Sequence, residues 1–159
     1  MPDESKMTVA DEPVAFDVED GAETLRDQYL IFLSDGLHFG VSAEYVVEIL
    51  TNYAITHLPM VPHYVRGIIN LRGQIIPIID IRLRLGKPSQ EDNCIVVINV
   101  AGTQLGILVD TVEQMITIPK GSVSPMPANN DQKLVSGMCT LPDGSGTMMV
   151  LDCVLLVSA

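Results

Sequence analysis

The chain contains an internal repeat. The stretch LIFLSDGLHFGVSAEYVVEIL, which begins at Leu30, aligns without a gap with VVINVAGTQLGILVDTVEQMI, which begins at Val96. The coinciding positions include Gly36 with Gly102, Gly40 with Gly106, Val41 with Ile107, Glu44 with Asp110, and Val46 with Val112. Because a repeated sequence folds into a repeated unit, the pattern predicts one β-rich unit of about 60 residues written twice.

The repeat continues further along the chain. Gly67 and Leu71 correspond to Gly137 and Leu141, and the segment IIPIIDIRLRL corresponds to TMMVLDCVLLV. This second match pairs Asp80 with Asp152, and each aspartate is expected to cap a turn or a short helical piece at the end of a strand. Short strands joined by glycine turns predict an all-β fold of two small barrels, since closure hides the strand edges. The expected copies are residues 28–86 and 94–157, intertwined.

The densest apolar segment is VRGIINLRGQIIPIIDIRLRLG, from Val65 to Gly86. It predicts a hairpin with a turn at Arg72-Gly73, because the isoleucines favour strands and glycine accepts positive φ. Pro77 cannot donate to a strand ladder, so its strand is expected to be an edge or to carry a bulge. The segment also carries most of the cations of the domain, namely Arg66, Arg72, Arg82, Arg84 and, just beyond it, Lys87. We therefore interpret it as a basic, aliphatic docking face.

The remaining segments are shorter. QYLIFL and LHFGV, on either side of Ser34-Asp35-Gly36, predict a β-hairpin. Periodicity leaves Ala43 to Leu50 open between a short helix and a strand. Two further segments, Asn52 to His63 and Gly121 to Lys133, are expected to be loops because they contain proline, serine or asparagine.

The charge of the chain is uneven. It has 159 residues and a formal net charge of −11, and residues 1–27 hold nine acidic and two basic side chains. That first segment lacks apolar periodicity, so residues 1–27 are predicted to be a disordered acidic tail and residues 28–159 the folded domain. The sequence has no apolar run long enough to span a membrane and no signal peptide pattern, which predicts a cytoplasmic protein.

No residue pattern indicates catalysis. The three cysteines, Cys94, Cys139 and Cys153, form no CxxC motif and are expected to be buried apolar residues. The histidines are not spaced with carboxylates or cysteines, and the phosphate-binding glycine loop is also missing. With no tryptophan and 4% aromatic residues, the chain offers little for stacking bases or prolines. A nucleic-acid-binding barrel using Arg66, Arg72, Arg82 and Arg84 stays as an alternative from another class.

At this point the segments YLIFLSDGLHFGVSAEYVVEIL and VRGIINLRGQIIPIIDIRLRLG are informative together, because they resemble the CheW-like family, the coupling proteins of bacterial chemotaxis. The resemblance covers about residues 28–156. It implies two five-stranded SH3-like β-barrels around a shared core. It also implies an adaptor without enzymatic activity or cofactor, which binds the cytoplasmic hairpin tip of chemoreceptors and the regulatory domain of the histidine kinase CheA in membrane-associated arrays.

The resemblance further implies residues that contact partners. Glu48 and Arg72 stand where the family has an acidic and basic pair implicated in signalling. The other positions fall in segments implicated in partner contacts: Val46, Ile49, Gly67, Gly73, Gly106, Val112 and Met115. Each also has a structural interpretation, since the glycines supply turns or close packing and the valines fit a core.

Two points separate this chain from the family pattern. The sequence stops soon after its last strand-like run, so the family's C-terminal helix is in doubt, and no receiver-like segment follows. The sequence therefore predicts a stand-alone coupling protein. An adaptor for a related chemosensory system, such as one that controls pilus motility, is the alternative within the same fold.

Overall fold

The computed structural model describes residues 25–89, 94–126 and 134–158. The predicted tail lies outside this part of the chain except for residues 25–27. Strand β1 begins at Arg26, two residues before the predicted start of the domain, because Arg26 and Asp27 pair with Pro119 and Ile118 of β8.

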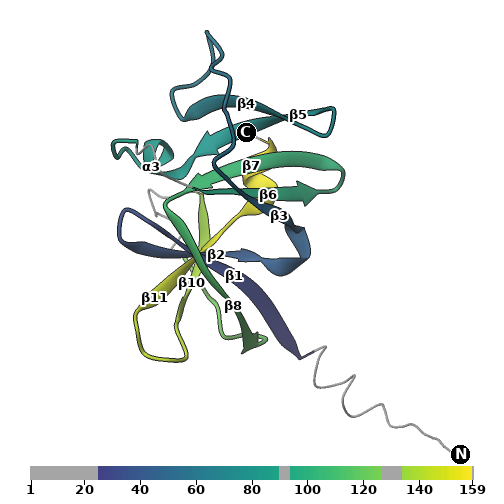
Figure 1. The fold of residues 1–159 in the computed structure, drawn as a ribbon. Coiled ribbons are helices and arrows are strands. Elements are labelled where there is room, and N and C mark those ends of the chain that lie inside the picture. Colours follow the sequence, from purple (N-terminus) through teal and green to yellow (C-terminus); the bar gives the residue numbers. More distant parts are fainter. Residues whose placement is uncertain (1–24, 90–93, 127–133, 159) are drawn as a thin grey trace, which may run out of the picture.

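Within these ranges, eleven strands form two sheets, which lie one above the other in Figure 1. The five-stranded sheet has the order β3 (Val46–Thr51), β6 (Cys94–Val100), β7 (Thr103–Val109), β5 (Gln74–Asp80) and β4 (Val65–Leu71). The six-stranded sheet has the order β8 (Thr111–Pro119), β1 (Arg26–Ser34), β2 (Leu37–Ser42), β11 (Thr147–Leu151), β10 (Val135–Thr140) and β9 (Ser124–Pro125). The prediction of an all-β fold is confirmed.

The two sheets follow one plan. Each takes strands from both copies of the repeat, and each contains a single parallel pairing, which joins Ile78 to Gly106 in one sheet and Val150 to Gly40 in the other. These are equivalent positions in the sequence alignment, so the register is repeated as well as the order. The ladder from β10 to β9 corresponds to an isolated bridge between Ile68 of β4 and Thr56.

The predicted central hairpin is present as β4 and β5. Arg72 and Gly73 have φ values of 50° and 87°, which is the pattern of the tight hairpin turn with positive φ at both central residues. The backbone N–H of Gly73 also donates to Asn70 Oδ1 over 2.9 Å. The sequence identified this turn correctly.

The expectation that Pro77 marks an edge strand is wrong. β5 lies between β7 and β4, and the bulge in this hairpin falls between Val65 and Gly67 instead. Pro77 faces Ile68, whose N–H and C=O both bond to Thr56 on the other side. The missing N–H of Pro77 therefore points towards β7, where the parallel ladder begins only at Ile78.

Short helical pieces connect or follow strands in the described part of the chain, namely η2 (Ala43–Tyr45), α3 (Ile81–Arg84) and α4 (Cys153–Ser158). The segment left open between helix and strand is therefore η2 followed by β3. The apolar run after Asp152 forms the short helix α4. None of the helices in the described ranges is long and apolar enough to cross a membrane.

Both aspartates cap helical pieces as predicted. The buried Asp80 carboxylate accepts hydrogen bonds from the N–H groups of Arg82 and Leu83 at the start of α3. Asp152 accepts one from Leu155 N–H in α4 over 3.0 Å.

The main hydrophobic cluster lies between the two sheets. Phe32 and Phe39 of the six-stranded sheet stack at 5.6 Å, and they share this cluster with Val96 and Ile107 of the five-stranded sheet. Leu156 of α4 is buried in the same cluster. Because residues of both sheets bury the same apolar surface, the sheets form one shared core.

Candidate partner-binding surface

The outer strand β3 carries exposed aliphatic side chains. Val47 is 49% exposed and Ile49 is 42% exposed, whereas Val46 is half-buried against the shared core. β3 is the first strand in its sheet, and its ladder to β6 shifts register between Val46 and Glu48. We call residues Val46–Thr51 the β3 edge. Exposed apolar residues beside an unpaired strand edge are typical of protein contact surfaces.

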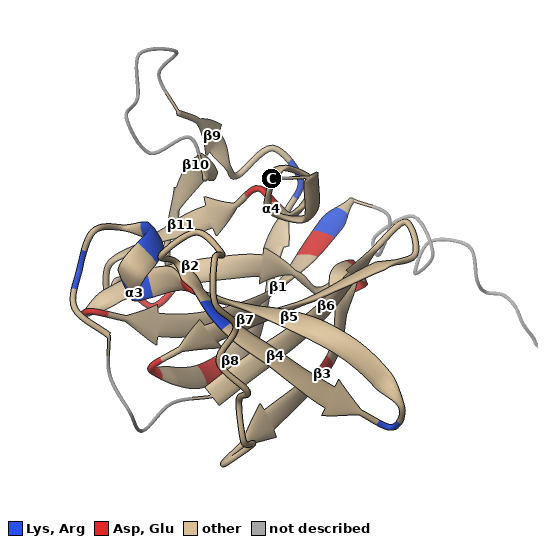
Figure 2. Cartoon of the chain, turned by 90° about the horizontal axis from the view of Figure 1, so that it is seen from above, with Lys and Arg blue, Asp and Glu red and all other residues tan. Residues whose placement is uncertain are grey.

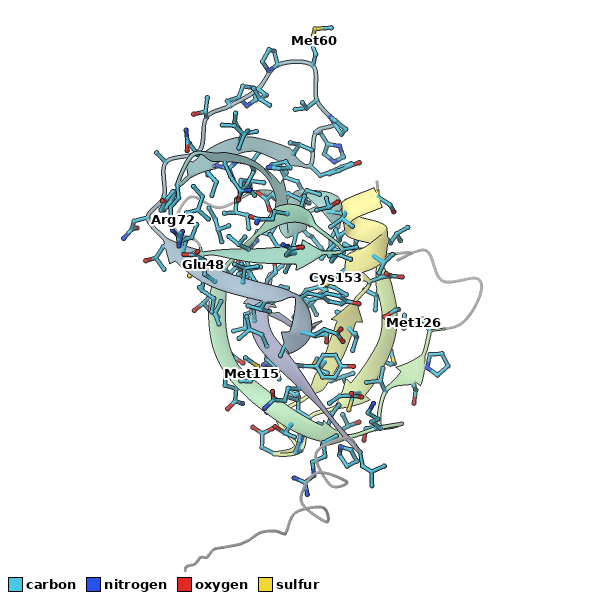
Figure 3. All side chains as sticks on the ribbon, turned by 90° about the vertical axis from the view of Figure 1, so that its right-hand side faces the viewer. Glu48, Met60, Arg72, Met115, Met126 and Cys153 are labelled. Carbon is cyan, nitrogen blue, oxygen red and sulfur yellow. The ribbon has the colours of Figure 1, made fainter. Side chains whose placement is uncertain are left out.

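An ion pair tethers the β3 edge to the tip of the central hairpin. Glu48 Oε1 accepts hydrogen bonds from Nη2 of Arg72 at 2.6 Å and from Nη1 at 3.0 Å. The two side chains come from opposite edges of the five-stranded sheet, so the sheet is curled enough to bring them together (Figure 3). The Arg72 side chain is 67% exposed, so the pair itself contributes little to the free energy of unfolding.

The glycines among the predicted site residues have packing roles. A Cβ on Gly67 would collide with the carbonyl oxygen of Thr56, and Gly67 has a φ of 147°. A Cβ on the buried Gly106 would collide with Ile78 and Ile95, whereas Gly73 needs only its positive φ and has open space around it. Close approach and turn geometry are sufficient to explain these three glycines.

β8 is the counterpart of β3 in the other sheet. Val112 is half-buried against the shared core, while Met115 is 48% exposed. Met115 lies on the same side of the molecule as Glu48 in Figure 3. Of the predicted residues, Ile49, Arg72 and Met115 have exposed side chains, and the Glu48 side chain is partly exposed. Ile75, at 59% exposure, is a further exposed residue that the sequence did not single out.

The basic side chains of residues 65–87 all have partners in the folded chain, so the segment does not present a free cationic face, and its docking role stays a prediction. Arg66 is bonded to Asp80 at 3.1 Å, the Arg84 guanidinium lies 4.9 Å from the centre of the Tyr64 ring, and Lys87 lies 3.7 Å from Asp35. The cationic residues are spread over several elements in Figure 2. The charge counted along the sequence did not include the partners that folding brings near these cations. Because the cations are paired, the nucleic-acid alternative is weakened.

Arg82 has the most complete set of partners. Its Nε and Nη2 donate to the two carboxylate oxygens of Asp110 at 2.7 and 2.6 Å, and its Nη1 lies 3.2 Å from Asp35 Oδ1. The hydrogen bond from Arg82 lowers the pKa of Asp110 below its ordinary value, against the opposing effect of burial. This cluster was not predicted, because its members lie 28 and 47 positions apart in sequence.

His38 and the three cysteines lie in surroundings that are typical of structural residues. His38 lies 3.3 Å from Glu113, Cys139 and Cys153 are buried, and Cys94 is half-buried rather than fully buried as expected. Burial, with smaller contributions from Asp152 and Glu44, raises the pKa of the Cys153 thiol to about 12, which keeps it protonated and unreactive. Within the described residues, no three histidine, cysteine or acidic side chains cluster in a way that could hold a metal ion.

Two β-sheets over a shared core, with exposed aliphatic strands and an exposed ion pair, define a β-sheet interaction domain. The comparisons with known proteins agree with this class. A family model described as the CheW-like domain matches residues 28–159. The chain belongs to the CheW-like family.

Individual relatives support the assignment. The chain is 31% identical over 108 residues to a protein named "Chemotaxis protein CheW" from Klebsiella aerogenes, covering 66% of this chain and 65% of that protein. It is 30% identical over 104 residues to the protein of the same name from Bacillus subtilis, covering 64% and 67%. The chain thus spans about two thirds of the length of these relatives. The crystal structure of the scaffolding protein TtCheW from Thermoanaerobacter tengcongensis superposes with a TM-score of 0.73 at 29% identity, covering 79% of this chain and 88% of that one.

Proposed function

We propose that the chain is a non-catalytic chemotaxis adaptor that holds the regulatory domain of the kinase CheA and the cytoplasmic hairpin tip of chemoreceptors in one complex. It would act at membrane-associated receptor arrays on the cytoplasmic side. The observation that carries this proposal is the β3 edge, where Val47 and Ile49 are exposed beside the Glu48 and Arg72 pair. Membership of a family that includes chemotaxis and scaffolding proteins supports it.

The geometry favours a protein partner at the β3 edge. Exposed aliphatic side chains gain free energy when a partner removes them from water, and a free strand edge can pair with another backbone. The neighbouring ion pair adds orientation, since an incoming charge of the wrong sign is repelled. Because the pair adds little to folding, we expect it to act on the choice of partner.

The experiment combines reversal of the pair with its restoration. Arg72→Glu places two carboxylates together and is expected to reduce capture of the kinase regulatory domain or of the receptor hairpin at least about tenfold, with almost no change in Tm. The double variant Glu48→Arg with Arg72→Glu restores opposite charges in the reverse order.

The double variant distinguishes two roles of the pair. If it recovers binding, the pair acts by holding the β3 edge to the hairpin tip. If it stays defective while its Tm matches the parent, the partner reads the individual charges. Unchanged capture of both partners by Arg72→Glu would contradict the placement of the binding surface at this pair.

A further inference from the structure

The chain passes between the two sheets at two equivalent places. It crosses through η2 between β2 and β3, and again at Asp110 between β7 and β8. The sequence alignment pairs Glu44 of the first crossing with Asp110 of the second. It also pairs α3 with α4, which begins after the equivalent capping aspartate. We call the surroundings of Asp110 the α3 junction and the surroundings of Glu44 the α4 junction.

Directional ionic bonds fasten the α3 junction. Arg82 of α3 bonds to both carboxylate oxygens of Asp110 and also to Asp35 in the turn between β1 and β2. The Arg82 side chain is only 12% exposed. Asp35 N–H donates to Asp110 Oδ2 at 2.9 Å, and Asp110 N–H donates to the carbonyl of Leu33 at 3.0 Å. One arginine therefore links the five-stranded sheet, the crossing and the six-stranded sheet. We call these bonds among Arg82, Asp110 and Asp35 the clamp.

The α4 junction has the same plan, but its equivalent residues form no ionic bonds with one another in the described part of the chain. The residues equivalent to Arg82 and Asp35 are Val154 and Ala101. Val154 is 55% exposed, and the Glu44 carboxylate accepts a hydrogen bond from the nearby Ser42 hydroxyl at 3.3 Å. The helix is held by burial of its apolar residues Cys153 and Leu156 in the shared core.

We propose that Arg82 forms a pivot, and that the two sheets move relative to each other by opening at the α4 junction while the α3 junction stays closed. Bidentate arginine and carboxylate bonds fix both distance and direction. Apolar contacts are non-directional and permit packed elements to slide over one another. Because the α3 junction is held by directional bonds and the α4 junction by apolar contacts, the motion is confined to the α4 junction.

This motion has a direct consequence for binding. η2 leads without a break into β3, so opening at the α4 junction shifts the β3 edge relative to the six-stranded sheet. The consequence for signalling rests on the proposed function, in which a partner binds the β3 edge. The pivot itself does not depend on any partner, and it can be tested on the free chain.

Amide hydrogen exchange resolved by NMR can follow one backbone hydrogen bond at each crossing. Val46 N–H bonds to the Ala43 carbonyl at the α4 junction, and Asp110 N–H bonds to the Leu33 carbonyl at the α3 junction. Both amides lie far from the chain ends, so end fraying affects neither. After correction for intrinsic rates, we expect Val46 to exchange at least about tenfold faster than Asp110. Equal protection of the two amides would overturn the proposal.

Transferring the clamp provides the second test. Val154→Arg combined with Ala101→Asp places the three clamp groups at the α4 junction and should slow exchange at Val46 about fivefold or more. Val154→Gln with the same Ala101→Asp change is the matched control, because it adds length and polarity without charge. Ala101 has a φ of 52°, which aspartate tolerates. Equal slowing by both variants would refute the ionic explanation.

Loosening the clamp provides the third test. Arg82→Lys keeps the charge but loses the bidentate geometry. We expect the Asp110 amide to exchange faster, so that the difference in exchange rate between the Val46 and Asp110 amides becomes smaller. Amides in the middle of β6 should change little. Uniform acceleration across the chain would show that Arg82 acts only on overall stability, and it would overturn the pivot.

Discussion

The five-stranded and six-stranded sheets share their strand order, yet they differ in how charge is used. Asp80, at the end of β5, is 2% exposed and is bonded to Arg66 and Ser89 as well as to two backbone N–H groups. Its counterpart Asp152 is half-buried and caps α4 alone. The two copies therefore share the features that fix the backbone, namely the capping aspartates and the close glycine contacts. The side chains around these features make different interactions in the two sheets.

The largest contrast is expected at an equivalent pair of glycines. A Cβ on Gly67 meets the Thr56 carbonyl oxygen at a φ of 147°, whereas a Cβ on Gly137 meets Val123 and Ser124 at an ordinary φ. Gly67→Ala should cost about 4 kcal/mol of unfolding free energy, and Gly137→Ala about 2 kcal/mol, because only the first adds backbone strain. Urea denaturation of both variants measures the difference. Equal losses would mean that the backbone adapts equally well to an added Cβ at Gly67 and at Gly137.

The capping aspartates should show the next largest difference. Asp80→Ala leaves Arg66 without its carboxylate partner and removes the cap, so a loss of about 3 kcal/mol is expected. Asp152→Ala removes only a cap, with a loss of about 1 kcal/mol. Thermal and urea unfolding of the two single variants would check this order, and a larger loss for Asp152→Ala would reverse the comparison.

The contribution of Asp110, at the crossing between β7 and β8, to the free energy of unfolding should depend on pH. The pKa of Asp110 is lowered in the folded chain, chiefly by the Arg82 hydrogen bond, so its contribution to stability is fully present above the unfolded value, about pH 4. It is lost as the pH falls through the folded pKa. Asp110→Asn should therefore cost about 2 kcal/mol at pH 7, and this difference from the parent should shrink below about pH 4. A difference that is independent of pH would exclude the ionised carboxylate as its source.

The smallest effect is expected at the end of β1. Ser34 is fully buried and its hydroxyl has no hydrogen-bond partner among the residues that the structure describes, while the equivalent residue of the other copy is the apolar Val100. Ser34→Ala should therefore leave stability unchanged or raise it by up to about 1 kcal/mol, since no hydrogen bond is lost. A clear loss in the urea midpoint would indicate that the hydroxyl is bonded in solution.

Much of the fold could be predicted because its signals are local. The Arg72-Gly73 turn follows from glycine at a position of positive φ, and the caps at Asp80 and Asp152 follow from aspartate at a strand end. The repeated all-β plan follows from self-similarity along the sequence. These features need no knowledge of distant contacts.

The features that were missed depend on distant contacts. Pro77 sits inside a sheet because the β7 ladder begins one residue later, which the sequence does not reveal. Arg82 and Arg84 were assigned to a docking face because Asp110, Asp35 and Tyr64 are brought to them only by folding.

The proposed binding role of the β3 edge can be tested most directly with two matched variants. Ile49 and Leu37 are both 42% exposed in strands, but only Ile49 lies on the β3 edge. Titration calorimetry with the CheA regulatory domain and with a receptor hairpin measures the Kd for each. We predict that Ile49→Glu weakens binding of at least one of them more than about tenfold, whereas Leu37→Glu leaves both unchanged. Equal Kd values for Ile49→Glu and the parent would contradict the account.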